Sequence, residues 1–227
     1  MASGVLSPKN TGDEASYVAF NDRPFGGHRL LLDLVPAGGR VLDVGCSGGY
    51  LAERLLARGS SVVGVEMDPR AADRARAFCE DVLVADVEAT ELPFEPATFD
   101  TIICADLIEH LRDPGAFLAR VRPLLRPGGA LVLTTPNVAN WSIRLQLLFG
   151  RFRYTDRGIL DRTHAHLFTR KTLVECLRAS GYEPETIDFT VPVPVLGTPL
   201  VERIAHAIGA LRPSLFAFQF VVAARPR

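Results

Sequence analysis

Short apolar runs alternate with helical segments through the middle of this chain, and this alternation limits the fold more than any other feature. The runs lie at residues 41–44, 61–65, 82–85, 101–104 and 130–134. Apolar runs without polar alternation are typical of strands that are buried on both faces of a sheet. Separated by helices, they predict an α/β fold with a doubly wound, mostly parallel sheet, in which the first strand lies near the middle.

The remaining segments predict further helices and two late strands, which bring the sheet to seven strands. The late strands are expected at residues 187–190 and 216–223, and the insertion at 137–168 is expected to form a helical lid. The length of 227 residues suits one domain that comprises the whole chain, 1–227. Helices are expected at 29–34, 50–58, 114–125, 141–149, 169–180 and 198–211, with another that Asp68 caps and Pro69 opens.

Composition excludes several classes of protein. Lys and Arg (25) nearly balance Asp and Glu (26), which lacks the basic excess of a nucleic acid-binding surface, so no nucleic acid partner is expected. The four cysteines show no paired spacing, which is typical of reduced thiols in a cytoplasmic protein. We also expect no secretion signal, because the first ten residues lack a basic stretch and an apolar run, and no membrane-spanning segment, because no uncharged apolar run is long enough.

A glycine-rich turn follows the first predicted strand, in the run Asp43-Val44-Gly45-Cys46-Ser47-Gly48-Gly49-Tyr50. Glycine lets the backbone approach a ligand closely, and the next helix directs its N-terminus there. Glu66 closes the second strand, where a carboxylate can accept hydrogen bonds from ribose hydroxyls. A dinucleotide site would require glycine at positions 45, 47 and 50. Because Ser47 and Tyr50 occupy two of these positions, NAD fits poorly. A site for another nucleotide, or a compact unit without a ligand, stays open.

Motifs in five places resemble, in the same order, those of class I S-adenosylmethionine (SAM)-dependent methyltransferases. They lie at residues 43–49, 63–69, 85–87, 100–111 and 125–129. Ser47 departs from the first motif, which usually has glycine there. The resemblance implies SAM as cofactor and S-adenosylhomocysteine (SAH) as product. SAM carries a sulfonium and no phosphate, so its site needs few cationic residues.

The resemblance also implies which residues contact the cofactor. Asp43, Gly45 and Ala105 would hold the methionine end, and Glu66 would bind the ribose. The candidates for the adenine are Met67, Asp86 and Val87, and those in the turn are Cys46, Ser47 and Gly49.

A narrower resemblance covers residues 136–182 and concerns the acceptor. This stretch is similar to a bacterial methyltransferase group associated with glycan and natural-product assembly, and to O-methyltransferases of ubiquinone biosynthesis. It implies methyl transfer to a hydroxyl of a small-molecule, sugar or lipid-linked acceptor, with Asn137, Trp141 and Tyr154 as candidate contacts. The alternatives are an N-methyltransferase of a small molecule, or a non-catalytic SAM-binding partner in such a pathway.

Two helices of this second half carry apolar residues whose surroundings the sequence leaves open. In the lid helix they would wall an acceptor pocket or, as we prefer for most of them, pack on the core. In the late helix they would face the core, a second copy in a homodimer, or a membrane. The lid residues are Trp141, Ile143, Leu145, Leu148 and Phe149, and the late residues are Leu200, Val201, Ile204 and Ile208.

Hydroxyl methylation requires a base, and histidine suits this role at neutral pH. His164 is the preferred base, with Asp161 to orient it, because it lies where the lid returns to the domain. The i, i+2 spacing of His164 and His166 sends their side chains to opposite sides of an extended chain. His166 and His110 are the alternative bases. We expect the other two histidines, at positions 28 and 206, to be structural or exposed.

A metal site is a further hypothesis, although we expect no metal. Asp106, Glu109 and His110 stand at i, i+3 and i+4, so a helix would place them on one face. Ubiquinone-type methyltransferases have a similar arrangement that can hold a divalent ion. Carboxylate ligands would favour Mg²⁺.

Overall fold

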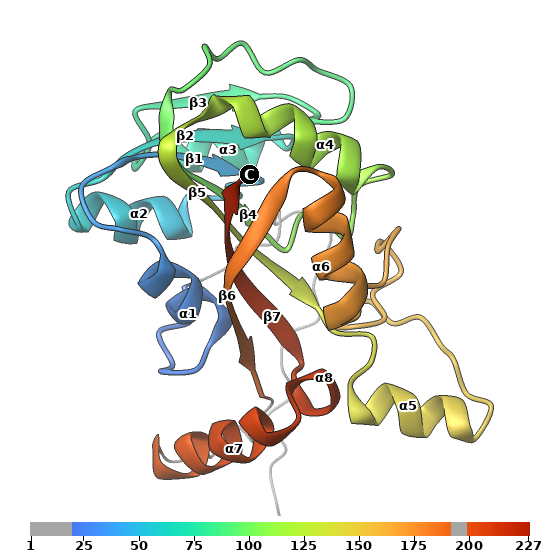
Figure 1. Ribbon diagram of the computed structural model, residues 1–227. Coiled ribbons are helices and arrows are strands. Elements are labelled where there is room, and N and C mark those ends of the chain that lie inside the picture. Colours follow the sequence, from blue (N-terminus) through green and yellow to red (C-terminus); the bar gives the residue numbers. More distant parts are fainter. Residues whose placement is uncertain (1–19, 192–198) are drawn as a thin grey trace, which may run out of the picture.

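The computed structural model describes residues 20–191 and 199–227, and these build a sheet of seven strands (Figure 1). The strand order is β3-β2-β1-β4-β5-β7-β6, with β7 antiparallel to both neighbours and the other pairs parallel. The predicted doubly wound, mostly parallel sheet is confirmed. The strands are β1 (Arg40–Val44), β2 (Ser61–Glu66), β3 (Asp81–Val84), β4 (Phe99–Ala105), β5 (Leu125–Pro136), β6 (Tyr182–Thr190) and β7 (Gln219–Pro226).

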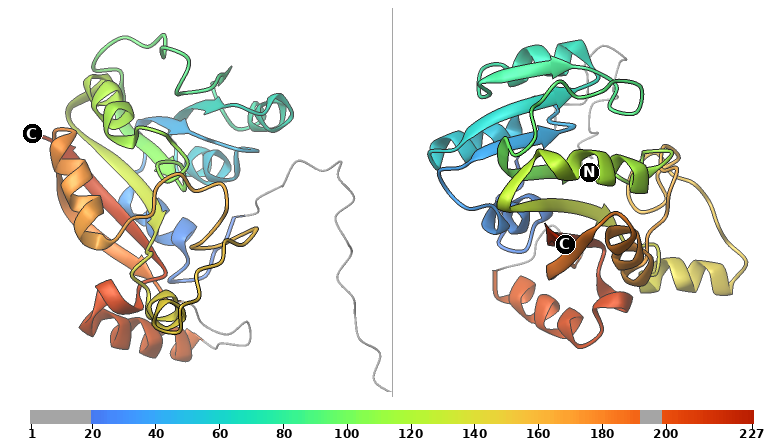
Figure 2. Two further views of the ribbon diagram at one scale, coloured as in Figure 1. Left: turned by 90° about the vertical axis from the view of Figure 1, so that its right-hand side faces the viewer. Right: turned by 45° about the horizontal axis from the view of Figure 1, so that its top comes forward.

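Helices cover both faces of this sheet (Figures 1 and 2). Asp68 caps α3 by accepting a hydrogen bond from the N–H of Arg70, as predicted, and Thr169 caps α6. The start predicted for the late helix at Thr198 lies outside the described residues. The helices are α1 (Gly27–Leu34), α2 (Tyr50–Ala57), α3 (Pro69–Ala75), α4 (Pro114–Val121), the 3-10 helix η1 (Arg122–Leu124), α5 (Trp141–Leu148), α6 (Arg170–Ala179), α7 (Pro199–Leu211) and α8 (Pro213–Phe216).

Successive strand residues enter different halves of the core. Val41 and Ile103 pack with α1 and α2 on one face, whereas Leu42 and Ile102 pack with α4 and α6 on the other. All four side chains are fully buried. Burial of each stabilises the fold by about 1.5–3 kcal/mol. Burial on both faces is the reason that the strands appear in the sequence as continuous apolar runs.

Several element boundaries differ from the prediction. Strands β5 and β6 begin earlier than expected, at Leu125 and Tyr182 instead of 130 and 187, and two further differences have a local reason. Helix α4 ends at Val121 instead of reaching Leu125, because Pro123 lacks the N–H that another helical turn requires. Strand β7 begins at Gln219, since Phe216 belongs to the short helix α8 instead.

The carboxyl ends of β1, β2, β4 and β5 meet at one edge of the sheet, which is where doubly wound folds bind ligands. Strand β6 ends at this edge and β7 begins there, because β7 is antiparallel to β6 and β5. The lid insertion also starts here, directly after β5. Its helix α5 extends outward from the body of the molecule (Figure 2).

Candidate active site

The turn between β1 and α2 keeps side chains away from the ligand-binding edge. Gly45 and Gly49 have φ of +78° and +81°, in the left-handed region that favours glycine. A Cβ on Gly49 would lie 2.9 Å from Cα of Ala75, so a side chain would displace α3. Ser47 has φ of +50° and so adopts the glycine-like conformation without being glycine.

Asp43 places a buried carboxylate next to this turn. Asp43 is 1% exposed, and its Oδ2 has no hydrogen-bond partner among the described residues. Burial, followed by the charge of Glu66, raises the pKa of Asp43 to about 7. A buried carboxylate oxygen without a partner fits a ligand that brings a cationic donor. The ammonium group in the methionine part of SAM is such a donor.

Glu66, at the end of β2, connects the glycine turn to the next loop. Its Oε2 accepts a hydrogen bond from the N–H of Ser47 at 2.8 Å, and its Oε1 accepts one from the N–H of Asp68 at 2.9 Å. These bonds fix the half-buried carboxylate at the edge of the sheet. Each carboxylate oxygen retains a further lone pair, as binding of two ribose hydroxyls requires.

The residues predicted for the adenine lie on neighbouring loops beside Glu66. Met67 is 68% exposed, and Val87 is buried near the start of the loop after β3. Asp86 is exposed, and its Oδ1 accepts a hydrogen bond from the N–H of Glu88 at 2.9 Å. Asp86 therefore also stabilises its own turn.

The segment after β4 differs from the expected helix. Residues 106–110 form turns, and Asp106 has φ of +49°. Its Oδ1 accepts hydrogen bonds from Thr134 Oγ1 at 2.9 Å and from the side-chain amide of Gln219. Asp106 is therefore directed toward β5 and β7 and does not share a face with Glu109 and His110, so the predicted set of three candidate ligands is wrong.

His164 takes the place of Asp106 beside those two residues. Glu109, His110 and His164 each have one ligand-type atom within 4.8 Å of the others. Glu109 is 1% exposed, and neither carboxyl oxygen has a hydrogen-bond partner among the described residues. Burial, followed by the charge of Asp106, raises the pKa of Glu109 well above its ordinary value and so favours its neutral form. The pKa of His110 is lowered, chiefly by burial.

Hydrogen bonds to carbonyl groups fix the proton on each histidine of the returning lid. Nδ1 of His164 lies 3.1 Å from the carbonyl oxygen of Ile159, and a carbonyl only accepts. The neutral ring of His164 therefore carries its proton on Nδ1 and leaves Nε2 able to accept one. His166 has the reverse arrangement, since its Nε2 lies 2.9 Å from the carbonyl oxygen of Arg112.

Asp161 orients a different histidine from the one expected. Its Oδ1 accepts hydrogen bonds from Thr163, at 2.8 Å from the N–H and 2.7 Å from Oγ1. Oγ1 of Thr163 lies in turn 3.2 Å from Nδ1 of His110. The side chain of Asp161 therefore positions His110 through Thr163, while the Ile159 carbonyl orients His164.

Residues 22–187 of this chain match the family model of a methyltransferase domain. The chain belongs to this methyltransferase family. Among solved structures, a SAM-dependent methyltransferase from Thermotoga maritima has a TM-score of 0.64 at 18% identity, over 88% of this chain and 87% of that chain. Another from Mesorhizobium loti has a TM-score of 0.61 at 20% identity, over 87% and 96%. Both solved structures share the fold of this chain. The family predicted from the sequence motifs, with SAM as cofactor, is confirmed.

Curated relatives of the methyltransferase include ubiquinone biosynthesis O-methyltransferases. That of Xanthomonas axonopodis pv. citri is 40% identical over 163 residues, which cover 68% of this chain and 66% of the relative. That of Acinetobacter baylyi is 36% identical over 107 residues, which cover 44% and 45%. The chain thus spans about half to two thirds of the length of these relatives.

Of the predicted acceptor contacts, Asn137 has a structural role. It is fully buried, and its Nδ2 donates to the carbonyl oxygen of Ala217 at 2.9 Å while its Oδ1 accepts from the N–H of Ala139 at 3.0 Å. It therefore connects the end of β5 to the residue that follows α8 and offers no free group to an acceptor. Trp141 and Tyr154 are about half exposed, at 48% and 53%, and stay candidates.

The apolar side chains of α5 and α7 do not pack on the core. In α5 only Ile143 is buried, against Ile159 and Leu160. The preferred core packing is therefore wrong for the other lid residues, and the core alternative is wrong for the late helix. The exposed residues are Trp141, Leu145 and Leu148 in α5, Phe149 directly after it, and Leu200, Val201, Ile204 and Ile208 in α7.

His28 was not expected at this site, but it lies beside the cofactor turn of the methyltransferase. Its ring packs against Tyr50 with a centroid distance of 4.6 Å, and its Nδ1 accepts a hydrogen bond from the N–H of Asn21 at 2.9 Å. Burial lowers the pKa of His28, and the charge of Asp106 opposes this shift. No spacing predicts this contact, because it depends on how α1 packs against α2.

The four cysteines are free, with two buried and two half-buried, in agreement with the prediction of reduced, mostly buried thiols. In the part of the chain that the structure describes, no helix is long and apolar enough to cross a membrane.

Proposed function

We propose that this methyltransferase transfers the methyl group of SAM to a hydroxyl of a small-molecule, sugar or lipid-linked acceptor, with His164 as general base. The observation that carries the proposal is the hydrogen bond from His164 Nδ1 to the carbonyl of Ile159. It leaves Nε2 free to accept a proton, at the edge of the sheet where the cofactor residues lie. The names of the ubiquinone biosynthesis relatives support a hydroxyl acceptor.

The chain's own groups then have separate tasks. Bound SAM supplies a methyl group that its sulfonium already activates. Asp43 holds the methionine end of SAM, and Glu66 holds its ribose. The turn at 45–49 lets the backbone approach the cofactor closely. His164 accepts the hydroxyl proton, because an un-ionised alcohol is a poor nucleophile. Positioning the acceptor and excluding water supply most of the remaining rate enhancement.

The test is the pair His164→Gln and His164→Ala, with His166→Gln as matched control. SAH formation would be measured with a panel of catechols and methyl glycosides, and SAH affinity by calorimetry. We expect turnover to fall by about a hundredfold or more in the His164 variants, with SAH affinity unchanged. Retained turnover would exclude His164 as base and would point to His110 or to an amine acceptor.

The group of Glu109, His110 and His164 also has the composition of a metal site, with two imidazoles and one carboxyl. Such ligands suit transition metals better than Mg²⁺, which prefers oxygen. The raised pKa of Glu109 favours its protonated form, which is a poor ligand. We therefore predict that exhaustive chelation leaves turnover unchanged. A loss that a single divalent ion restores would assign these residues to a metal.

A further inference from the structure

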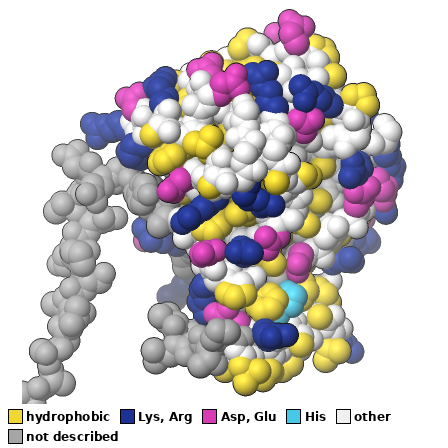
Figure 3. Space-filling view, turned by 90° about the vertical axis from the view of Figure 1, so that its left-hand side faces the viewer, with side chains coloured by type: hydrophobic (Ala, Val, Ile, Leu, Met, Phe, Trp, Pro, Cys, Tyr) yellow, Lys and Arg dark blue, Asp and Glu magenta, His cyan; other side chains and the backbone are white. Residues whose placement is uncertain are grey.

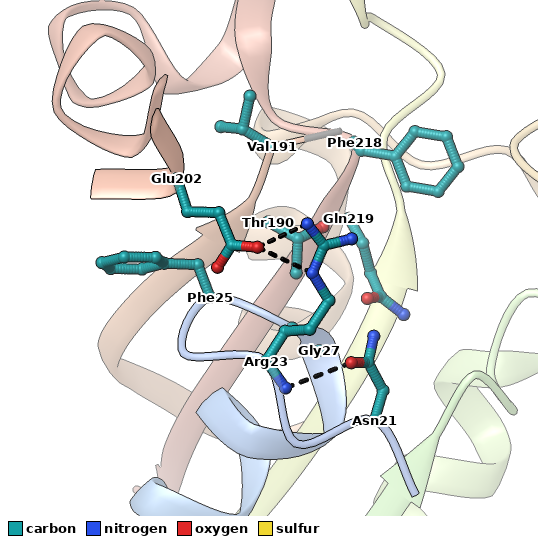
Figure 4. Close-up of a pocket in the computed structure, with 10 residues that line it drawn as sticks. Asn21, Arg23, Phe25, Gly27, Thr190, Val191, Glu202, Phe218 and Gln219 are labelled. Atoms are coloured by element: carbon teal, nitrogen blue, oxygen red, sulfur yellow. Dashed lines mark hydrogen bonds and ion pairs between the residues drawn. The ribbon is translucent and has the colours of Figure 1, made fainter. Parts of the chain in front are cut away.

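A cavity of about 270 Å³ opens at the carboxyl edge of the sheet, beyond the cofactor residues (Figure 4). Four separate segments line it: the chain leading into α1, the end of β6, helix α7 and the start of β7. None of the family motifs in the sequence contributes to it. Its main polar groups come from Asn21, Arg23, Thr190, Glu202 and Gln219.

Helix α7 presents its polar side to this cavity. Glu202 is 6% exposed, whereas Ile204 and Ile208 on the same helix are 51% and 52% exposed. Figure 3 shows hydrophobic side chains gathered at the lower end of the molecule, where α7 lies. A helix of a globular protein normally buries its apolar face. The inward carboxylate therefore has a task that hydrophobic packing does not explain.

Arg23 is the partner of this carboxylate. Its Nε lies 2.7 Å from Oε1 of Glu202, and its Nη2 binds the same oxygen. The third guanidinium nitrogen points away from Glu202, toward the side of the cavity where Gln219 lies (Figure 4). The arginine side chain is 40% exposed and that of Glu202 is 7% exposed. The pair is neutral overall, yet it offers N–H donors and a carboxylate acceptor to a ligand.

Glycines bring two amide side chains against the backbone of the same cavity. A Cβ on Gly27 would lie 2.3 Å from Oε1 of Gln219, and one on Gly26 would lie 3.1 Å from the side chain of Asn21. Any larger residue would push these amides away. Amides both donate and accept hydrogen bonds, as does the hydroxyl of Thr190.

Single hydrogen bonds connect this cavity to the cofactor residues. Gln219 donates to Asp106, which directly follows Ala105 at the methionine end of the site. On the other side, the N–H of Asn21 donates to His28, whose ring packs on Tyr50, the first residue of α2 after the glycine turn. Two separate hydrogen bonds therefore link the cavity to residues beside the proposed cofactor site.

We propose that this cavity binds an uncharged, hydroxyl-rich part of the acceptor, such as a sugar ring with neighbouring hydroxyls. The inference rests on the proposed transfer to a hydroxyl. Sugar hydroxyls donate and accept at once, which matches the neutral Arg23–Glu202 pair and the amides around it. A phenolic ring would contact the apolar lining residues Phe25, Val191 and Phe218, but it would remove water from the polar groups without replacing their hydrogen bonds. The balanced charge gives no net attraction for an anion.

The experiment is saturation-transfer NMR on the SAH-loaded protein, with methyl pyranosides of glucose, mannose, galactose and rhamnose as probes. Catechol and phenyl phosphate serve as comparison probes, the first for a phenolic ligand and the second for an anionic one. We expect at least one pyranoside to bind. Thr190→Val removes one hydroxyl at constant shape and should weaken binding by about three- to tenfold. Arg23→Gln should weaken it by more than about tenfold, and Thr186→Val, on the exposed part of β6, should leave it unchanged.

The outcomes separate the two proposals. If the protein without substitutions does not bind SAH, the result would count against the proposed function itself. Intact SAH binding, with catechol or phenyl phosphate binding and no pyranoside, would overturn the sugar assignment alone. Pyranoside binding that Thr190→Val and Arg23→Gln leave intact would place the sugar elsewhere and also overturn it. If Arg23→Gln fails to fold, Thr190→Val still decides the question.

Discussion

Helices α2 and α7 turn opposite kinds of side chain inward. Helix α2 buries Leu51 and Leu55 against the sheet, whereas α7 buries Glu202 and leaves Ile204 and Ile208 exposed. Both helices have one apolar and one polar side. What differs is the surface beneath them. Under α2 it is an apolar sheet face, whereas under α7 it is a cavity whose lining combines the Arg23–Glu202 pair with apolar residues such as Phe25. The comparison teaches that hydrophobic packing organises the cofactor side, while the proposed acceptor side adds buried hydrogen bonds to its aromatic contacts.

Charge separates the same two regions. The cofactor edge is acidic, with Asp43, Glu66 and Asp106, and the sequence has no Lys or Arg between positions 43 and 53. The cavity beside α7 instead pairs Arg23 with Glu202. The first arrangement attracts a cationic ligand, and the second selects by hydrogen-bond pattern.

The largest effect on the cofactor side is expected at Asp43. Asp43→Asn keeps the shape but removes the buried charge that would meet the ammonium of the cofactor. Loss of one partner of a buried charge pair costs about 3 kcal/mol or more, so SAH affinity should fall about a hundredfold. Calorimetry at pH 8 checks this. Unchanged SAH affinity would show that the charge of Asp43 does not contribute to cofactor binding, so charge would not distinguish the cofactor edge from the cavity beside α7.

The pKa of Asp43 also predicts a pH dependence. Because this pKa is raised to about 7, the folded protein binds more protons than the unfolded chain between about pH 4 and pH 7. Stability of the SAH-free protein should therefore fall as the pH rises through this window. SAH affinity should rise over the same window, since the ionised carboxylate binds the ammonium. Thermal unfolding and calorimetry should give these opposite slopes. Asp43→Asn should abolish the rise in SAH affinity and reduce the fall in stability, part of which stays because the pKa of Glu109 is also raised.

Glu66→Ala should have the next largest effect. Its carboxylate would lose hydrogen bonds to the ribose, each charge-assisted, at a cost of about 1.5–3 kcal/mol, so SAH affinity should fall at least tenfold. Binding of a sugar probe in the α7 cavity should stay unchanged. If both ligands lose affinity equally, the two regions are one coupled unit and the comparison fails.

The sequence predicts the cofactor side well because local patterns there coincide with tertiary structure. The residue order from Asp43 to Glu66 gives strand, turn, helix and strand without reference to the rest of the chain. The cap at Asp68 follows from the same local rules. The predicted end of α4 at Leu125 is wrong, because Pro123 lacks the N–H that another helical turn requires.

The acceptor side was predicted less well because its contacts join segments far apart in the chain. Arg23 and Glu202 are 179 positions apart, and no local pattern pairs them. An amphipathic period also does not say which side of α7 faces inward when the interior is polar. Asp106 was placed with Glu109 on an assumed helix, but the turn at its positive φ sends its side chain toward Thr134.

The smallest expected effect is at Ser47, where the cofactor turn departs from glycine. Ser47→Gly relieves the cost of a left-handed conformation, about 1–2 kcal/mol for residues with a Cβ, but it also makes the unfolded chain more flexible, by about 0.4–1 kcal/mol. We expect a net gain in stability of about 1 kcal/mol or less. SAH affinity should stay within about twofold, because the N–H of residue 47 still donates to Glu66. Ala97→Gly is the matched control, since Ala97 has a similar φ of +53° in the loop before β4. Equal gains in the two variants, by denaturant unfolding, would mean that the turn has ordinary backbone strain. A loss of SAH affinity confined to Ser47→Gly would show instead that the serine hydroxyl or its rigidity shapes the cofactor site, and that polar contacts organise this side of the molecule too.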